Sequence, residues 1–549
     1  MRRHLLVILL AILLFFFIYP SSFLGSSKTL PDDNDTRLIA YIIGQVQTNL
    51  LHHQPLFFGT YFAPYPNTLT YSEPFLTSAL ITLPVRIFTS SPIAIFNLAL
   101  IIGFVLTFIT SFLLFSYLTQ SSWLGLLGAL LFNLSGFHLT YLPHLQMFSL
   151  GQFFLTTYFF LRFQNENNSR FLDLFFIALT FQITESLFGA YLIFFTCLFI
   201  FIFNPKNFKK ILLRSFFFLP LWFIFLFPYL QMSHTFPEAA RPIRDAAHFS
   251  LGLEEIFTKY NSWPLIILFI LLAGQNILRT FAESVEAIFC KVRRAWSPEN
   301  SGVYALQTRN FLRGPSELVE RGVDSQIDRK LSVALNLIQK TSIWSAIFLF
   351  SLIMSLGPVV KIFGHSVKIL GLPLPLPYTA FYYLFPGFTG LRTPSRFIVL
   401  TAIAATILII KKIFPYTRKL LPITKISLTL LLILCLMLQY HFPLPSYPVD
   451  TLIPKVYDQV KPLPQTAIIL ELPLKLWNDE GHEIESLRSL YSLSHQHRRI
   501  GGYSGFAPLA WIDLVEQIKS TGLSPENLNR LHALGVTHLV ENNTLRPLP

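Results

Sequence analysis

The chain has 549 residues, of which 52% are hydrophobic and only 13% are charged. This balance excludes an ordinary soluble protein, because one or two water-soluble cores cannot bury so much apolar surface. The formal net charge of +13 does not indicate nucleic-acid binding, since the basic residues lie in short loops between apolar runs and form no basic domain. The composition therefore predicts a mainly α-helical, polytopic membrane protein.

Apolar runs of about 20 residues recur along the chain, and in lipid only a helix satisfies its backbone hydrogen bonds within one segment. We predict a bundle of about eleven spans. They are expected at 4–23, 92–118, 122–141, 147–163, 171–187, 188–203, 211–230, 263–279, 341–359, 396–413 and 426–441. The first run also has the length of a signal peptide, but it lacks a clean cleavage site, and we interpret it as an uncleaved span.

The positions of the basic residues predict the orientation in the membrane. Loops on one side carry Arg2, Arg3, Arg162, Arg170, Lys206, Lys209, Lys210, Lys411, Lys412, Arg418, Lys419 and Lys425. Because basic residues favour the cytoplasmic side, we expect a cytoplasmic N-terminus and an external C-terminus in the plasma (inner) membrane. The loops at 24–91, 231–262 and 360–395 are then external.

The sequence predicts two domains, a transmembrane domain over 1–441 and an extracytoplasmic domain over 442–549. In the external loop at 24–91, residues 37–53 and 74–88 have helical periodicity with a polar face, so we expect two interfacial helices on the outer leaflet. Mixed charges at 280–340 are typical of a solvated surface and predict a cytoplasmic helical insertion, to which we assign no function.

The C-terminal composition is that of a soluble α/β domain. Residues 466–473 are expected to form a buried strand, followed by helices near 508–520 and 525–534 and a returning strand at 536–541. Ser524 is placed to cap the second helix and Gly535 to end it.

An acidic cluster, Asp32-Asp33-Asn34-Asp35-Thr36-Arg37, follows the first span where the chain emerges at the outer surface. A carboxylate there can accept the proton of an attacking hydroxyl. The alternative is that Asp35 only caps the helix that begins at Thr36, and one residue can do both. Asp35 is the first candidate, Asp33 the second, and Arg37 a candidate for substrate binding.

Two arginines lie at the outer end of an expected span, in Arg392-Thr393-Pro394-Ser395-Arg396. Guanidinium groups at this depth suit a phosphate, which arginine binds in bidentate fashion. The alternative is snorkelling to lipid headgroups, although basic residues are disfavoured on the outer side.

Further polar candidates lie near the same surface. Glu73 precedes the second interfacial helix, where it can cap that helix or contact a sugar hydroxyl, and Glu185 lies at the outer end of the fifth expected span. His138 and His144 flank Pro143, but a spacing of six does not place them on one helix face as a zinc pair. We predict no metal site.

The residues resemble those of the GT-C superfamily of polytopic membrane glycosyltransferases, specifically YfhO-like bacterial membrane proteins. The matching pieces, in chain order, are Asp35, Phe62 to Glu73, Ser135 to Gln146, Pro386 to Arg396, Glu471-Leu472-Pro473 and Gly501 to Phe506. The resemblance spans most of the chain but not the insertion at 280–340.

The resemblance implies a transferase that moves a sugar from a polyprenyl-phosphate carrier to an extracytoplasmic glycan, lipid or protein. It implies Asp35 as the catalytic base, with Asp33 in reserve; Arg37, Glu73, His138, His144, Arg392 and Arg396 are then expected around the substrates. No cofactor is required, and a divalent metal is compatible but not indicated. No nucleic-acid partner is expected.

Two other classes remain open. A transporter or flippase of lipid-linked glycans also needs a polytopic body, although we find no internal repeat, and the polar residues gather at the outer interface instead of the midplane. In a non-catalytic protein of envelope assembly, Asp35 would only cap a helix.

Overall fold

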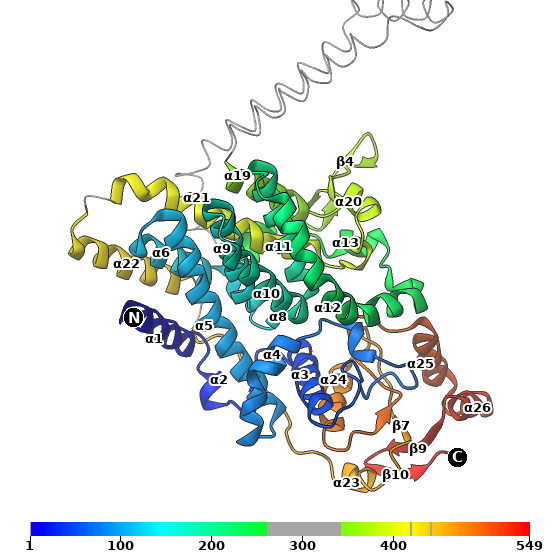
Figure 1. The fold of residues 1–549 in the computed structure, drawn as a ribbon. Coiled ribbons are helices and arrows are strands. Elements are labelled where there is room, and N and C mark those ends of the chain that lie inside the picture. Colours follow the sequence, from blue (N-terminus) through cyan, green and yellow to red (C-terminus); the bar gives the residue numbers. More distant parts are fainter. Residues whose placement is uncertain (1, 261–341, 418–419, 440–441) are drawn as a thin grey trace, which may run out of the picture.

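The computed structural model describes residues 2–260, 342–417, 420–439 and 442–549. Helices dominate, and the small C-terminal α/β domain lies at one end of them (Figure 1). The longer helices are α1 (Arg2–Ile18), α5 (Pro92–Thr119), α6 (Ser122–Asn133), α9 (Gly151–Glu166), α10 (Ser169–Glu185), α11 (Leu187–Phe203), α12 (Phe208–Thr235), α19 (Ile343–Ser355), α21 (Ile398–Thr417) and α22 (Pro422–Met437). The expected mainly helical fold with a small C-terminal strand region is confirmed.

Shorter elements occupy the segments between these helices. The helices are α2 (Ser21–Leu24), α3 (Asp35–Leu51), η1 (Thr68–Tyr71), α4 (Leu76–Thr82), η2 (Leu83–Ile87), α7 (Gly136–Leu139), α8 (Leu145–Phe148), η3 (Pro237–Ala239), α13 (Ile243–His248), α14 (Glu255–Thr258), α20 (Tyr378–Leu384), η6 (Phe388–Gly390) and η7 (Pro394–Phe397). The strands are β1 (Thr29–Leu30), β2 (Lys361–Ile362), β3 (His365–Ser366), β4 (Lys368–Ile369), β5 (Leu372–Pro373) and β6 (Tyr447–Pro448).

Each expected span overlaps a helix except that at 263–279, which lies outside the described residues together with the insertion at 280–340. Within the described residues, α5, α12 and the continuous helix Pro394–Thr417 are long and apolar enough to cross a membrane. The other apolar helices are shorter, so the number of eleven spans stays a prediction.

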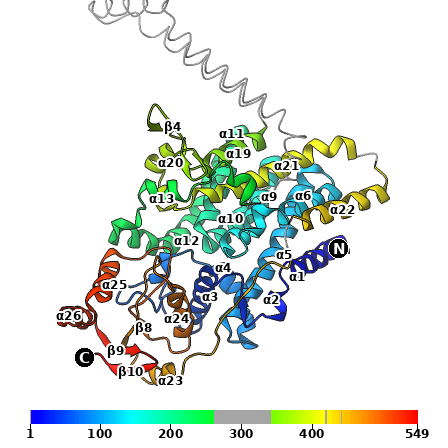
Figure 2. The same ribbon diagram turned by 180° about the vertical axis from the view of Figure 1, so that it is seen from behind.

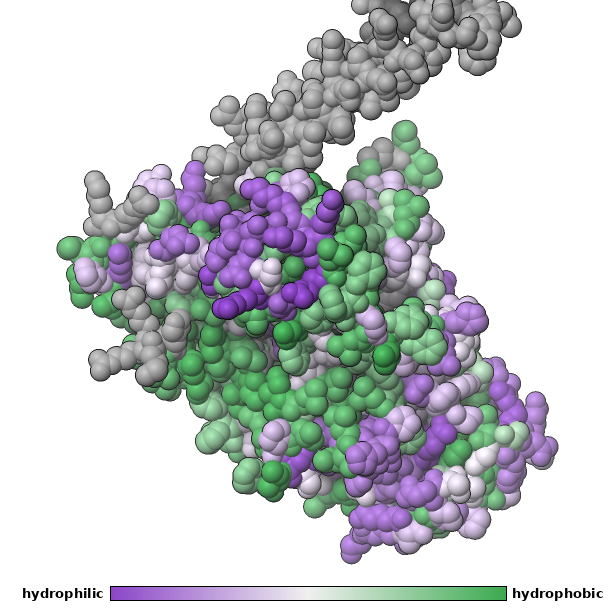
Figure 3. Space-filling model, in the orientation of Figure 1, coloured by the Kyte–Doolittle hydropathy of each residue, from purple (hydrophilic) through white to green (hydrophobic). Residues whose placement is uncertain are grey.

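The surface divides into polar and apolar areas. Figure 3 shows a broad hydrophobic area across the middle of one face, between a hydrophilic patch above it and the hydrophilic C-terminal domain below. Helix α12 contributes to the apolar surface, since Phe225 is its only buried residue. An outward apolar helix of this length is typical of a lipid-facing element.

The segment between α6 and α9 differs from the expected continuous spans. The helix expected at 122–141 ends at Asn133, and the one expected at 147–163 begins only at Gly151. Pro143 lies between the short helices α7 and α8, and a proline cannot donate the backbone hydrogen bond that a continuous helix needs. This break places His144, just before α8, and Gln146, within α8, beside a cavity.

The first external loop is packed more tightly than expected. Helix α3 is buried over most of its length, between α5 and the C-terminal domain, and does not present the polar face predicted for 37–53. The second expected helix, at 74–88, divides into α4 and η2 because Pro84 interrupts the hydrogen-bonding pattern. The polar residues of α3 instead form buried hydrogen bonds, such as that from Gln45 to Gln496 (2.9 Å).

The C-terminal domain contains a four-stranded sheet in the order β10-β9-β7-β8. Its elements are α23 (Val456–Val460), β7 (Ile468–Glu471), α24 (Glu483–Ser492), β8 (Arg498–Arg499), α25 (Leu509–Thr521), α26 (Pro525–Ala533), β9 (Val536–Glu541) and β10 (Thr544–Pro547). Strand β7 pairs in parallel with β8 and β9. The Ser524 hydroxyl accepts a hydrogen bond from the Asn527 N–H (3.3 Å), which confirms the predicted cap.

This domain shares one hydrophobic core with α1, α3 and α5. Backbone hydrogen bonds continue the contact: the Arg499 N–H donates to the Thr60 carbonyl (2.7 Å), and the Ala63 N–H donates to the Arg499 carbonyl (2.9 Å). Strand β1, after α1, pairs with β6, after α22. Figure 2, from behind, shows α3 and α24 lying together as in Figure 1.

We expect Gly502→Ala to loosen this contact. A Cβ atom at residue 502 would lie 2.7 Å from the ring of Phe62, which is buried and packs edge-on against Trp511 at 4.9 Å between centroids. Overpacking of this kind costs about 1–3 kcal/mol. Thermal unfolding of the whole chain measures the loss. Gly390→Ala is the matched control, since a Cβ there meets no atom within 4 Å; equal melting of the two variants would contradict the packing argument.

Candidate functional site

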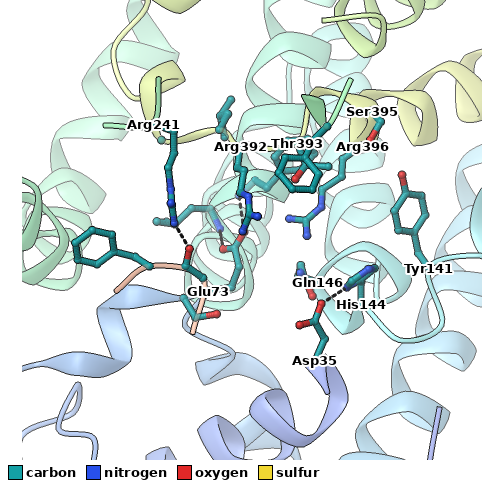
Figure 4. Close-up of a pocket in the computed structure, with 18 of the residues that line it drawn as sticks. Asp35, Glu73, Tyr141, His144, Gln146, Arg241, Arg392, Thr393, Ser395 and Arg396 are labelled. Atoms are coloured by element: carbon teal, nitrogen blue, oxygen red, sulfur yellow. Dashed lines mark hydrogen bonds and ion pairs between the residues drawn. The ribbon is translucent and has the colours of Figure 1, made fainter. Parts of the chain in front are cut away.

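Asp35 is the first residue of α3, and its carboxylate points into a cavity (Figure 4). The capping role belongs to Asp32, whose Oδ1 accepts hydrogen bonds from the N–H groups of Asn34 (3.0 Å) and Thr36 (2.9 Å) and from the Thr36 hydroxyl (2.8 Å). The alternative in which Asp35 serves as the side-chain cap is therefore wrong. The positive end of the α3 dipole still favours a negative charge at Asp35.

Both oxygens of Asp35 have neighbours in the cavity. Oδ1 accepts a hydrogen bond from the Tyr503 hydroxyl (2.8 Å), and Oδ2 lies 3.5 Å from Nδ1 of His144. Burial, reinforced by the charge of Arg396, lowers the pKa of His144 to about 4, so the imidazole is neutral at neutral pH. Burial also raises the pKa of Tyr503, and the carboxylate raises it further, which keeps that hydroxyl a donor. Both groups orient Asp35 without cancelling its charge.

The cavity has a volume of about 970 Å³ and is formed by segments that are far apart in the sequence. The first external loop, the α6–α9 connection, the segment 239–259, the segment 361–396 and the C-terminal domain each supply part of the lining. Its ionisable side chains are Asp35, Glu73, Tyr71, Tyr141, His144, Tyr191, Tyr229, Arg241, His248, Glu254, Glu255, Lys259, Lys361, Arg392, Arg396 and Tyr503. A space of this size accommodates a sugar together with a phosphate.

Arg392 and Arg396 enter the cavity from the side opposite Asp35 (Figure 4). Arg392 lies over the ring of Phe249 (4.2 Å from Cζ to the centroid), and Arg396 lies 5.9 Å from the ring of Phe188. Within the described residues, neither guanidinium forms an ion pair. The aromatic rings position both groups while leaving their N–H donors available to an anion.

A third guanidinium, Arg241, extends toward the same space (Figure 4). It donates a hydrogen bond to the Gly505 carbonyl. Burial and the neighbouring charge of Arg392 both lower the pKa of Arg241. Repulsion between like charges held together by the fold favours the binding of an anion between them.

Glu73 and Glu185 each accept hydrogen bonds from the first turn of the helix that follows the other glutamate in sequence. Glu73 does not cap α4, which follows it; its oxygens accept hydrogen bonds from the N–H groups of Leu187 (2.7 Å) and Phe188 (3.4 Å), at the start of α11. Glu185 instead accepts from the N–H (2.8 Å) and hydroxyl (2.6 Å) of Ser78, within the first turn of α4. The two carboxylates thus tie together helices that are distant in sequence, and Glu73 forms part of the cavity wall.

Besides Glu185, three sequence candidates lie outside the lining. Asp33 is exposed at the surface. Arg37 points toward the C-terminal domain, where its Nη1 lies 3.5 Å from the Glu483 carbonyl oxygen. His138 is fully buried, stacked on Phe148 at 4.6 Å between centroids, with both ring nitrogens beside backbone carbonyls.

The cavity also contains polar residues that the sequence did not single out. Tyr503 lies within the glycine-rich segment 501–506, and the resemblance includes that segment without indicating a role for its tyrosine. Arg241 is a basic residue in an expected external loop, the same signal that identified Arg392. Gln146 stands beside His144, and its amide oxygen has no hydrogen-bond partner among the described residues.

Within the described ranges, His, Cys, Asp and Glu side chains do not gather in any group of three or more that would hold a metal ion. Comparison with known protein families found no match to the chain. Comparison with curated proteins likewise found no similar protein. The chemistry of the site is therefore inferred from its geometry.

Proposed function

We propose that this chain is a multi-pass membrane glycosyltransferase that moves a sugar from a polyprenyl-phosphate carrier to an extracytoplasmic acceptor. The observation that carries the proposal is the placement of Asp35: another residue caps its helix, and its carboxylate faces Arg392 and Arg396 across one cavity. A base on one side and phosphate-binding groups on the other are what an in-line displacement needs.

In the proposed reaction, Asp35 accepts the proton of an acceptor hydroxyl as its oxygen forms a bond to the anomeric carbon of the donor. The bond from that carbon to the phosphate oxygen breaks, and the electron pair leaves with the polyprenyl phosphate. Arg392 and Arg396 stabilise the charge that develops on the departing phosphate. Because the nucleophile enters opposite the leaving group, the anomeric configuration is inverted.

The lipid-linked nature of the donor is supported by the helices around the cavity. The apolar helix α11 and the long apolar helix Pro394–Thr417 both begin beside the cavity, and Arg396 belongs to the first turn of the second. In the predicted orientation this end is extracytoplasmic in the plasma (inner) membrane, where nucleotide sugars are scarce and a carrier lipid is within reach. The acceptor is a glycan, lipid or protein, and we expect the C-terminal domain, which contributes Tyr503 to the cavity, to hold or orient it.

Transfer by the purified protein in lipid nanodiscs tests the proposal. Polyprenyl-phosphate sugars that differ in the sugar are offered with envelope extracts as acceptors, and the product linkage is analysed by NMR. We expect transfer from at least one donor, with inversion and without added nucleotide. No transfer from any donor, combined with movement of the lipid-linked glycan across proteoliposome membranes, would replace this proposal with a flippase.

A further inference from the structure

Two consecutive hairpins, β2–β3 and β4–β5, follow α19, and they have nearly the same sequence. Residues 360–364 read Val-Lys-Ile-Phe-Gly and residues 367–371 read Val-Lys-Ile-Leu-Gly, a local repeat confined to the two hairpins. Lys361 pairs with Ser366, and Lys368 pairs with Pro373, which leaves two residues in each turn. The repeat therefore places Phe363 and Leu370 at equivalent turn positions.

Both turn residues have backbone angles that disfavour bulky side chains. Phe363 has φ of 48° and Leu370 has φ of 53°, each followed by a glycine that also has a positive φ. Two-residue hairpins of this kind prefer Asn or Asp at the first position, because short polar side chains tolerate the left-handed region. The β9–β10 hairpin of the same chain follows this preference, with Asn542 and Asn543 at φ of 49° and 57°.

The apolar turn residues are not explained by packing within the described structure. Leu370 is 99% exposed, and Phe363 is 77% exposed. Other large apolar residues of the same segment are also exposed: Ile362, Leu372, Tyr383 and Leu384. Figures 1 and 2 both show the hairpin labelled β4 projecting from the body of the helices. Strained turns that expose large apolar side chains indicate contact with an apolar partner.

The first of the two hairpins, β2–β3, is attached beside the cavity. The Lys361 ammonium donates to the His248 carbonyl (3.0 Å), and the Leu253 N–H donates to the Lys361 carbonyl (3.0 Å). Lys361 and Gly364 belong to the cavity lining. The segment lies between two apolar helices, α19 and α21, both of which overlap expected spans. In the predicted topology, this segment therefore connects the outer ends of two spans.

We propose that the turns at Phe363 and Leu370 insert into the lipid leaflet beside the cavity, with the exposed Lys368 at the level of the lipid phosphates. This inference rests on the membrane location in the proposed function, but not on transferase activity. Exposed apolar residues with a flanking lysine match the two zones of a bilayer surface, an acyl region and an anionic headgroup region. The inserted turns would hold the mouth of the cavity against the leaflet that contains a lipid-linked donor.

Spin-label accessibility in lipid nanodiscs tests the insertion. The label is attached to Leu370→Cys in the full chain, with the three native cysteines replaced by alanine. The matched control is Asn542→Cys, at the equivalent position of the β9–β10 turn. We expect collisions with oxygen, which concentrates in lipid, to dominate at residue 370, and collisions with a water-soluble nickel chelate to dominate at residue 542. Equal nickel accessibility at both sites would overturn the proposal.

A second measurement asks whether the apolar turns cause the insertion. Phe363→Asn/Leu370→Asn keeps residues that the turn conformation favours, so the hairpins stay folded. A label on Leu372→Cys is expected to become nickel-accessible in this variant. Unchanged nickel accessibility of the label at residue 372 would contradict lipid insertion. In the first measurement, a label at residue 370 that protein shields from both reagents would also contradict it. Insertion of the turns without any sugar transfer would support this inference and contradict the proposed function. Sugar transfer with water-exposed turns would contradict this inference and support the proposed function.

Discussion

Asp35→Asn is expected to reduce transfer by about 10²–10⁴-fold, the usual contribution of a general base. Asparagine keeps the size of the side chain and still accepts the hydrogen bond from Tyr503, but its amide cannot accept the proton of the acceptor hydroxyl. Helix α3 stays capped by Asp32, so the variant folds. Single-turnover transfer from a saturating donor measures the loss in the chemical step.

The same assay on Asp33→Asn provides the control. Asp33 belongs to the same acidic cluster and carries the same charge, yet it is exposed and lies outside the cavity lining. We expect its transfer rate to stay close to that of the wild type. Equal losses in the two variants would indicate that the cluster acts only through its summed charge, and full activity in Asp35→Asn would remove the residue from the mechanism.

Arg499→Met is expected to destabilise the C-terminal domain by about 3–5 kcal/mol, the cost of leaving buried charges unpaired. Arg499 is 1% exposed and forms ion pairs with Glu471 and with Glu485 (2.5 Å), which are equally buried. Tyr457 donates a further hydrogen bond to Glu471. Thermal unfolding of the whole chain measures the effect. Arg546→Met is the control, because its pair with Glu541 is half-exposed and contributes less than about 1 kcal/mol.

Neutralising the two glutamates in the same background separates charge from packing. Arg499→Met/Glu471→Gln/Glu485→Gln removes the uncompensated charges and should recover much of the lost stability. Failure to recover any of it would attribute the loss to the arginine's packing instead.

The network also predicts sensitivity to acid. Burial raises the pKa of Glu471, but the guanidiniums of Arg499 and Arg488 outweigh it, and the net pKa lies below the ordinary value. A lowered carboxyl pKa stabilises the fold above the ordinary glutamate pKa of about 4.3, and that contribution is lost as pH falls through the lowered value. We expect the melting temperature of the wild type to fall below about pH 4 more steeply than that of Arg499→Met.

The sequence predicted the helical body because a long apolar run has few alternatives to a helix in lipid. It could not distinguish the four residues from Asp32 to Asp35, since all are good caps and the choice depends on where the first helical turn begins. Arg392 was accessible to prediction because a basic residue at an outer helix end is unusual.

Tertiary structure decided the remaining roles. Glu73 caps α11, and Glu185 caps α4. This pairing depends on how the two helices approach each other and not on local sequence. The sequence does not show which of the two histidines flanking Pro143 faces the site, but the fold buries His138 and leaves His144 beside Asp35. Sequence patterns identify residues that are able to cap a helix or line a site, and long-range packing determines which of them do so.

The hydrogen bond between Asp35 and Tyr503 joins residues that are 468 positions apart. During synthesis, the aspartate therefore leaves the ribosome long before its tyrosine partner. The cavity wall from the C-terminal domain is absent until residue 503 and its neighbours have been made, and such distant contacts form slowly. A nascent chain that still lacks this domain carries the acidic cluster without the hydroxyl that binds Asp35.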